Sequence, residues 1–353
     1  MTRLLEILIS LAIVVALYLV VGLALPSSRH LVEKIETNRK LTIVFDTLNS
    51  FRRFKDWNTL VLRDPGMQVT LSGPEEGEGA QFDYASDKKG VGKGSWKIVE
   101  SVPREKIAFA IENQERGDNK RTEFTFKPTG RNNRNVEITQ TYDVDYGWNL
   151  IGRYAGLYVT RHVGDDMKMG LTRLVNMLAA VPNVDYAVKD SKMTTPKVVE
   201  RPAEDLLVVS AGAVERGNAQ IQASMTSNSE WIKRVIDANG LEAVGPLRIV
   251  TTDLGRETYT FDVVQPVRKK DGSAITSVAT QGPVQHVQSP ASKAAVASYT
   301  GYMAELENVR NALRAWAATH GHEVKDRAFE DYKSGVSGAF TENGQFDVYW
   351  PVK

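Results

Sequence analysis

The heptapeptides FDVVQPV at 261–267 and FDVYWPV at 346–352 agree at five of seven positions and lie 85 residues apart. Each follows a predicted helix that ends in a glycine, EWIKRVIDANG at 230–240 and ENVRNALRAWAATHG at 307–321. A glycine just past the last turn is a frequent helix terminator, and a proline near the end suits a terminal strand. The repeat predicts that residues 197–353 form a duplicated strand–helix–strand–strand unit with a cleft between its halves.

A different pattern occupies residues 40–181. It opens with LTIVF at 41–45, which we interpret as a strand, and a short helix around 47–54. Strand-like stretches separated by glycine-rich and asparagine-rich turns follow at 67–72, 80–85, 94–100, 106–112, 121–128 and 135–144. Apolar residues then recur at helical spacing from Met167 to Val181. The pattern predicts an α+β helix-grip domain, in which a curved antiparallel sheet wraps a long C-terminal helix and leaves room for an apolar cavity.

The first 28 residues form a third segment, which we interpret as a transmembrane anchor. Residues 4–25 read LLEILISLAIVVALYLVVGLAL and contain one charge, Glu6. A helix of this length spans roughly 33 Å, about the thickness of the hydrocarbon core of a bilayer. A cleaved signal peptide is the alternative, but the apolar run exceeds the usual length of about 7–15 residues in such peptides. The polar stretch 182–196 is predicted to be a linker between the two larger bodies.

The charges that flank this segment do not decide on which side of the membrane the rest of the chain lies. Arg3 precedes it, and Arg29, Lys34, Arg39 and Lys40 follow it. That count favours a cytoplasmic body, whereas a short N-tail before an apolar run is typical of exported bacterial proteins. We favour a single-pass protein of the bacterial inner membrane with a periplasmic body, and a cytoplasmic body remains the alternative.

Composition excludes several functional classes. A formal net charge of +1 gives no basic field for nucleic acid, so no nucleic-acid partner is expected. The absence of cysteine rules out disulfides, thiolate catalysis and cysteine-based zinc sites. The GxGxG at 90–94 lacks the following helix of a phosphate loop, and we interpret the histidines, including the His320-x-His322 pair, as surface residues. We expect no metal and no cofactor.

The body at 40–181 resembles the START-like superfamily, the SRPBCC-type polyketide cyclase/dehydrase domains with a helix-grip fold. The resemblance lies in FDTLNSFRRFKDWNT at 45–59, DPG at 64–66, GEGAQFDY at 77–84, GKGSWKIVESVPREKIAF at 92–109 and GLTRLVNML at 170–178. It implies a ligand-binding fold, in which Trp57, Trp96 and Phe109, with Phe82, Phe124 and Phe126, would face either a packed core or a ligand cavity. We find no acid/base pair on the inward-facing positions.

The body at 197–353 resembles the gyrase-inhibitor-like (GyrI-like) effector-binding domain, which is also the ligand-binding half of some bacterial multidrug-sensing regulators. The resemblance lies in VERPAEDLLVVS at 199–210, SYTGYMAELENV at 298–309, FEDYKSG at 329–335 and FDVYWPVK at 346–353. No helix-turn-helix accompanies it here. The resemblance implies a cleft for cationic aromatic ligands at Glu330 and Tyr332, with Tyr302, Trp316, Tyr349 and Trp350 as walls. Because strand residues alternate, at most one of Tyr349 and Trp350 lines a given cleft.

Three hypotheses of function remain. The first, which we favour, is a membrane-anchored tandem binding protein for small, largely apolar ligands, some of them cationic and aromatic, without catalysis. The second is an enzyme, either a START-like cyclase or dehydratase or a hydrolase that acts through Glu330 and Tyr302. The third is an envelope scaffold that binds a protein partner, whose identity the sequence leaves unknown. The alternative for the C-terminal site is that Glu330 is a solvent-exposed charge in the stretch ATHGHEVKDRAFEDY at 318–332, and that the aromatic residues belong to the core.

Overall fold

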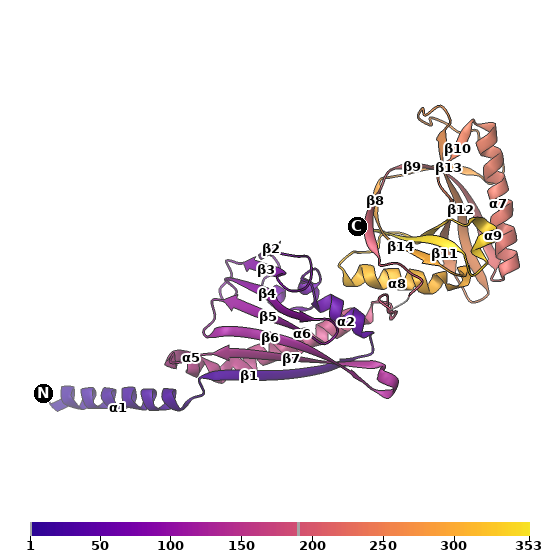
Figure 1. Ribbon diagram of the computed structural model, residues 1–353. Helices are drawn as coiled ribbons and strands as arrows, with labels where there is room; N and C mark the ends of the chain where they lie inside the picture. The colour runs from indigo at the N-terminus through magenta and orange to yellow at the C-terminus, as the bar shows by residue number, and fades with distance from the viewer. Residues whose placement is uncertain (1, 189–190) are drawn as a thin grey trace. The chain divides into compact units, whose positions relative to one another are not determined.

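The computed structural model describes residues 2–188 and 191–353, which fall into two compact units, Met1–Ala180 and Val181–Lys353 (Figure 1). Each unit contains helices and its own curved antiparallel sheet, which confirms the predicted α+β class. Each sheet buries one apolar face under helices of the same unit, the usual way for a sheet to remove its apolar face from water.

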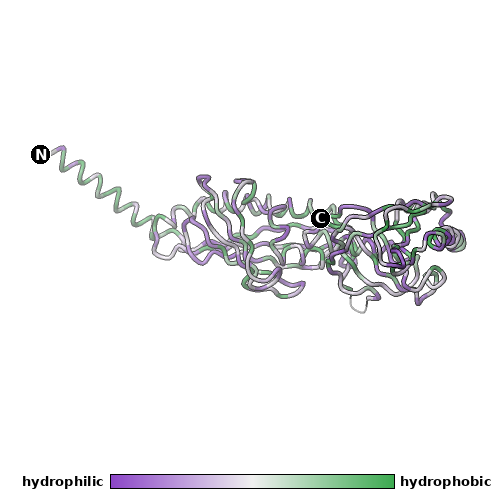
Figure 2. The backbone as a smooth tube through the Cα atoms, turned by 90° about the horizontal axis from the view of Figure 1, so that it is seen from above, coloured by the Kyte–Doolittle hydropathy of each residue, from purple (hydrophilic) through white to green (hydrophobic). Residues whose placement is uncertain are grey.

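The helix α1 (Thr2–Ala24) opens the N-terminal unit. Its large apolar side chains are exposed along nearly the whole helix, and Figure 2 colours most of it as hydrophobic. The stretch Arg3–Ala24 is long and apolar enough to cross a membrane. This length and composition fit a membrane anchor and also a signal sequence.

The described part of the N-terminal unit contains one seven-stranded sheet with the order β1-β7-β6-β5-β4-β3-β2. All of its neighbouring strands pair antiparallel. The strands are β1 (Ser28–Thr37), β2 (Gln68–Ser72), β3 (Gln81–Ala85), β4 (Lys93–Val102), β5 (Lys106–Asn113), β6 (Asp118–Thr129) and β7 (Asn135–Asp145).

The long helix α6 (Val159–Ala179) lies against the sheet, beside β1, and buries Met167, Leu171, Leu174 and Leu178. This is the apolar stripe that the sequence predicts. The shorter helices of the unit are α2 (Leu41–Leu48), α3 (Phe54–Trp57), α4 (Leu60–Arg63), η1 (Arg131–Asn133), α5 (Leu150–Ala155) and η2 (Gly156–Tyr158).

Two local predictions at the start of this unit differ from the structure. The stretch 41–45 belongs to the helix α2 and is not a strand, because its apolar residues are buried on several sides of a short helix. A short continuous apolar run does not distinguish a buried strand from a buried helix. The edge strand β1 precedes the predicted domain start at residue 40 and pairs with β7 along its whole length, from Ser28↔Asp145 to Thr37↔Val136. The sheet therefore begins within four residues of the end of α1.

The described part of the C-terminal unit contains a nine-stranded sheet whose main path runs β13-β9-β12-β11-β15-β16-β14-β8, with β10 paired to β12. The strands are β8 (Lys197–Arg201), β9 (Glu204–Glu215), β10 (Leu241–Ala243), β11 (Leu247–Leu254), β12 (Thr258–Lys269), β13 (Gln285–Ser289), β14 (Ser292–Thr300), β15 (Phe329–Tyr332) and β16 (Gln345–Val352). The two FDV-containing stretches lie in β12 and β16, and the duplication of a whole unit remains a prediction.

The helices of this unit are α7 (Asn218–Ala238), η3 (Met303–Glu305), α8 (Leu306–Thr319) and α9 (Gly335–Ala339). The two long ones, α7 and α8, pack on β9 and β16 respectively. Gly240 and Gly321 follow them with φ of 62° and 76°, the left-handed conformation that favours glycine at a helix end. In the predicted linker, Met193 pairs with Tyr299 of β14, and the buried hydroxyl of Tyr186 lies 3.0 Å from that of Thr319.

Candidate functional site

The N-terminal unit contains a cavity of about 420 Å³ between the sheet, α6 and the short helices α3 and α4. Its apolar wall comes from Trp57, Trp96, Ile111, Tyr142 and Met167. Aromatic rings and one thioether on rigid strands and helices give a preformed surface for an apolar molecule. Of the residues predicted to face a cavity or a core, Trp57 and Trp96 line the cavity.

Phe109, which was predicted as a ligand contact, lies in the packed core at 1% exposure and is not part of the cavity lining. Its ring contacts Trp96 edge-on, with 5.9 Å between ring centroids. Phe109 therefore supports a cavity wall from behind. Phe82, Phe124 and Phe126 are buried in the same way and are absent from the cavity lining.

The deep part of the cavity carries a small polar ladder on neighbouring strands. Gln140 of β7 donates from Nε2 to Thr122 Oγ1 of β6 at 3.2 Å, and Thr122 donates to the carbonyl of Thr141 at 2.6 Å. Both side chains are buried and line the cavity. Burial raises the pKa of the nearby Tyr142 hydroxyl above its ordinary value, so this phenol stays neutral. The deep wall is thus polar but uncharged.

One buried donor in the wall has no partner in the described structure. Trp57 is 3% exposed, and its Nε1 forms no hydrogen bond with any residue that the structure describes. A buried N–H without an acceptor destabilises a protein by about 1–3 kcal/mol. The N–H itself is enclosed, so an acceptor atom on a molecule inside the cavity would remove that penalty only after the Trp57 ring or its neighbours moved.

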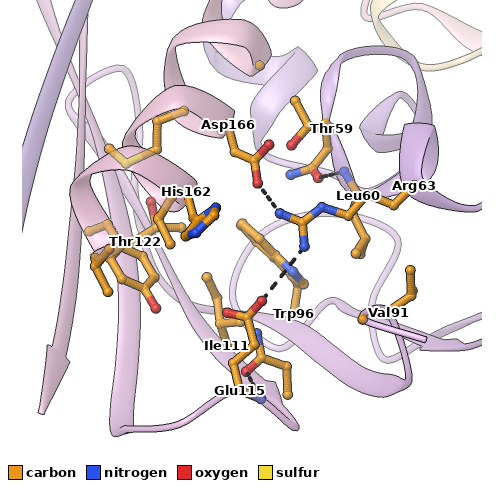
Figure 3. Close-up of a pocket in the computed structure, with 18 of the residues that line it drawn as sticks. Thr59, Leu60, Arg63, Val91, Trp96, Ile111, Glu115, Thr122, His162 and Asp166 are labelled. Carbon is orange, nitrogen blue, oxygen red and sulfur yellow. Dashed lines mark hydrogen bonds and ion pairs between the residues drawn. The ribbon is translucent and has the colours of Figure 1, made fainter. Parts of the chain in front are cut away.

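The rim carries charged side chains that pair with one another. Figure 3 shows the Arg63 guanidinium of α4 between two carboxylates, Asp166 of α6 and Glu115 of the β5–β6 loop. Arg63 donates to Asp166 and lies 3.7 Å from Glu115. His162 lies one turn before Asp166 on α6 and also lines the cavity. With Arg116, the rim carries two arginines and two carboxylates and so has no net formal charge, counting His162 as neutral.

Sequence reasoning missed the rim and the polar ladder. Arg63, Glu115 and Asp166 are each more than 50 residues from one another in sequence, and no local motif joins them. The only available signal was the alternation of β6 and β7. Gln140 occupies an inward-facing position between Ile138 and Tyr142, and Thr122 occupies one between Lys120 and Phe124.

Glu330, the leading candidate of the C-terminal unit, is fully buried on β15. Arg310 of α8 donates from Nε to Glu330 Oε1 at 2.5 Å, and the other carboxylate oxygen has no partner among the described residues. Burial raises the pKa of Glu330, and the Arg310 charge opposes this rise. The interpretation of Glu330 as a solvent-exposed charge is therefore wrong.

Tyr332 and Tyr259 lie against the same ion pair. Tyr332 is 1% exposed, and its hydroxyl also has no partner among the described residues. Burial raises the pKa of Tyr332 and raises that of Tyr259 to about 12. Glu330, Tyr332 and Arg310 thus form an enclosed polar cluster with two unused acceptor or donor atoms.

The other predicted C-terminal residues are spread over the unit. Tyr302 is 46% exposed before η3, and Trp316 stacks on His320 of its own helix end with 4.6 Å between ring centroids. Tyr349 stacks on Phe329 at 4.9 Å, and Trp350 donates to the carbonyl of Asp326 and lines a shallow hollow with Arg310. Among the described residues, no recorded hydrogen bond or ion pair joins any of these four to Glu330.

Within residues 2–188 and 191–353, no group of three histidine, aspartate or glutamate side chains is placed to hold a metal ion. The carboxylates of both sites are instead engaged by arginines.

Comparison with known proteins gives one family match. Residues 28–179 match the family described as polyketide cyclase / dehydrase and lipid transport, which confirms the START-like resemblance for the N-terminal unit. The matched range begins at β1, at the residue where the sheet begins. Comparison with curated proteins found no match.

Three solved structures that match the chain do so at low identity. The C-terminal domain of EcmrR matches with 14% identity and a TM-score of 0.38, over 45% of this chain and 97% of that one. EcmrR in a complex with DNA matches with 16% identity and a TM-score of 0.38, over 58% and 72% of the two chains. Truncated norcoclaurine synthase from Thalictrum flavum matches with 10% identity and a TM-score of 0.34, over 43% and 94%.

Proposed function

We propose that the N-terminal unit binds a small, largely apolar molecule that carries a hydrogen-bond acceptor, and that α1 tethers this unit to a membrane. The observation that supports the proposal is the unpartnered Trp57 N–H in the wall of a 420 Å³ cavity. The aromatic wall would hold the apolar body, and Trp57 would donate to the acceptor. The matched family, whose description includes lipid transport, is consistent with this use.

Binding without catalysis is the better reading of the cavity. General acid/base work needs a titratable group aimed at the reacting atom and free to exchange a proton. Here the two rim carboxylates are paired with Arg63, and the deep wall offers the neutral groups of Thr122 and Gln140. His162, also on the rim, is the side chain through which a catalytic alternative would act. A cyclase or dehydratase would instead turn over a substrate in this cavity, and that outcome would replace our proposal.

Binding is tested on the full chain in nanodiscs with 6-propionyl-2-dimethylaminonaphthalene, an aromatic ketone whose carbonyl is an acceptor. Energy transfer from tryptophan to the probe reports bound molecules. Val163→Phe, which adds volume to the cavity wall, is expected to weaken the signal. Val175→Phe is the matched control, because Val175 lies on the same helix but outside the cavity lining. Equal signals from both variants would contradict the proposal.

We propose for the C-terminal unit a second site, for a cationic aromatic ligand at Glu330 and Tyr332. The unused Glu330 Oε2 and Tyr332 hydroxyl support it, because buried polar atoms without partners favour a ligand that satisfies them. Arg310 must move for a cation to reach the carboxylate, since it now occupies that position. Tyr349, Trp350, Trp316 and Tyr302 would contribute aromatic surface around the opened cluster.

The C-terminal site is tested by binding of 9-aminoacridine, a fluorescent aromatic cation. Glu330→Gln keeps the size of the side chain and removes its charge, so it should abolish binding if Glu330 is the anion. Hydrolysis of activated esters that requires both Glu330 and Tyr302 would favour the hydrolase alternative. A protein partner on this unit, with no effect of either small-molecule probe, would favour the scaffold alternative.

The proposed location is the bacterial inner membrane, with α1 as a single-pass anchor and the two units in the periplasm. The apolar length of α1 supports an anchor. Reporter enzymes that are active on only one side of the membrane, fused after Lys353, distinguish a periplasmic from a cytoplasmic body. Release of the full body from membranes by signal peptidase would replace the anchor with a signal sequence.

A further inference from the structure

Four large apolar side chains are exposed within one short stretch that follows β7. Trp148 is 83% exposed, Ile151 55%, Leu157 51% and Tyr158 61%. They lie on and beside α5 and η2. Single exposed apolar residues are common, but a run of them, with a tryptophan almost entirely in solvent, is typical of a surface that meets another apolar phase.

This stretch, residues 148–158, is attached to the C-terminal end of α1. The buried side chain of Arg153 donates from Nη1 to the carbonyls of Leu23 and Leu25 at 3.0 and 3.1 Å. Its Nε and Nη2 donate to the carbonyl of Gly147 at 2.8 and 2.6 Å. The last carbonyls of a helix have no partner within the helix, so Arg153 caps α1 and fixes α5 beside its end.

Side-chain packing extends the contact one to two turns back along α1. Tyr154 stacks on Tyr18 with 4.8 Å between ring centroids and donates its hydroxyl to the Tyr18 carbonyl at 2.8 Å. Gly22 allows this approach, because a Cβ there would lie 3.2 Å from the Tyr154 ring and 3.3 Å from Leu150 Cβ. The 148–158 stretch therefore has a defined height along α1.

The position of the 148–158 stretch along α1 coincides with the edge of a bilayer that α1 would span. The 23 residues of α1 span about 34 Å at ~1.5 Å per residue, slightly more than a hydrocarbon core of about 30 Å. Tyr18 precedes Ala24 by six residues, so Tyr154 lies about 9 Å inward from the end of α1. When α1 spans a membrane, α5 and η2 lie at the level of the headgroups and outer acyl chains, where tryptophan and tyrosine are enriched.

We propose that Trp148, Ile151, Leu157 and Tyr158 form a second membrane contact, which inserts into the interface of the bilayer beside α1. The occupant of this apolar surface is the lipid bilayer, because the surface is continuous with α1, whose apolar side chains are exposed at bilayer length. Tyr158 also lines the cavity, together with its neighbours Ala155 and Val159. The cavity rim would then lie at the lipid surface. The membrane contact stands whether or not the cavity binds a ligand.

The absence of cysteine makes the test direct, because every introduced cysteine is the only one in the chain. Trp148→Cys, Ile151→Cys and Leu157→Cys, each labelled with a nitroxide, are reconstituted as full chains in nanodiscs of phosphatidylcholine and phosphatidylglycerol. Collision rates with oxygen, which concentrates in lipid, and with a water-soluble nickel chelate report the surroundings of each label. Leu11→Cys on α1 is the lipid reference, and Leu71→Cys on β2, 55% exposed, is the water reference.

We expect the ratio of oxygen to nickel collision rates at positions 148, 151 and 157 to exceed that at 71 several-fold and to approach that at 11. The double variant Ile151→Asp/Leu157→Asp should return the label at 148 to the value at 71. If the collision ratios at positions 148, 151 and 157 equal that at 71 while the ratio at 11 is that of lipid, the membrane contact is overturned and the anchor is not. Spin–spin broadening between copies at these sites would also overturn it, because a second chain would then cover the surface. A water-like value at position 11 would overturn both.

Discussion

Arg310 Nε and Glu330 Oε1 lie 2.5 Å apart in a fully buried ion pair between α8 and β15. The attraction offsets part of the free energy needed to bury two charges, but it does not by itself make the pair stabilising. The pair leaves Glu330 Oε2 and the Tyr332 hydroxyl without partners among the described residues. Two buried charges and two buried polar atoms without partners are unfavourable for stability, and the proposed C-terminal site is centred on this cluster for that reason.

Arg310→Met should destabilise the C-terminal unit by about 3–5 kcal/mol, because it leaves a buried carboxylate without its cation. Arg314→Met, one turn further along α8 at an exposed position, should change the free energy of unfolding by less than about 1 kcal/mol. Arg310→Met/Glu330→Leu should recover most of the loss. Chemical denaturation of the full chain, followed at the transition of this unit, measures all three, and a double variant as unstable as the single one would contradict the ion-pair explanation.

Glu330 should make the stability of its unit depend on pH. Its pKa in the folded chain is raised above the ordinary value of 4.5 by burial. Below the ordinary value both states are protonated; above it the unfolded chain ionises first, so the folded state loses stability as pH rises towards the raised pKa. We expect wild type to lose stability relative to Glu330→Gln as the pH rises above about 4.5, the ordinary pKa of this group. Parallel stability curves for the two proteins would show that Glu330 titrates normally.

Trp57→Phe keeps an aromatic ring in the cavity wall and removes the unpartnered N–H. Affinity for the naphthyl ketone probe should fall by at most roughly tenfold, the value of one neutral hydrogen bond. Trp96→Phe, also in the wall, controls for the loss of ring size. Titration of the full chain in nanodiscs with the probe measures both affinities. A larger loss of affinity in Trp96→Phe would mean that the N–H of Trp96, and not that of Trp57, donates to the probe carbonyl.

Arg63→Met should change stability by less than about 1 kcal/mol, because the rim ion pairs are partly exposed to water. It should, however, change the charge preference of the cavity. Two unpaired carboxylates would favour 9-aminoacridine and disfavour the anionic anilinonaphthalene sulfonate. Arg116→Met removes the same charge from the rim without releasing Glu115 and Asp166. Equal preferences of the two variants for the cationic over the anionic probe would mean that only the net charge of the rim matters.

Arg153→Lys should loosen the junction between α1 and the 148–158 stretch. A lysine ammonium lacks the planar fork that reaches the carbonyls of Leu23, Leu25 and Gly147 together. These carbonyls are partly buried, so each one that loses its donor destabilises the junction by about 1 kcal/mol, and backbone hydrogen exchange around residues 148–158 should accelerate at least several-fold. Arg161→Lys, at an exposed position of α6, is the control. Unchanged protection in Arg153→Lys would show that Tyr154 and Gly22 suffice.

Features that depend on a single helix or strand could be predicted from the sequence. The apolar run of α1, the alternation of β5 to β7, the stripe of α6 and the glycines after α7 and α8 each reflect the period or the end of one element. The family motifs at 45–109 and 170–178 indicated the N-terminal domain that the family match confirms. Residues 41–45 were misassigned to a strand because their apolar run has no period of its own, and burial in the tertiary structure decided for a helix.

Everything that depends on elements meeting in space was decided by the tertiary structure alone. Arg310 meets Glu330, Arg63 meets Asp166 and Arg153 meets Leu25 across separations of 20 to more than 100 residues. Loop lengths and sheet registers set these encounters, and neither leaves a local pattern in the sequence. The first 25 residues show the difference: their composition gives a helix that can cross a membrane, whereas the position of the 148–158 surface at its end follows from the guanidinium of Arg153.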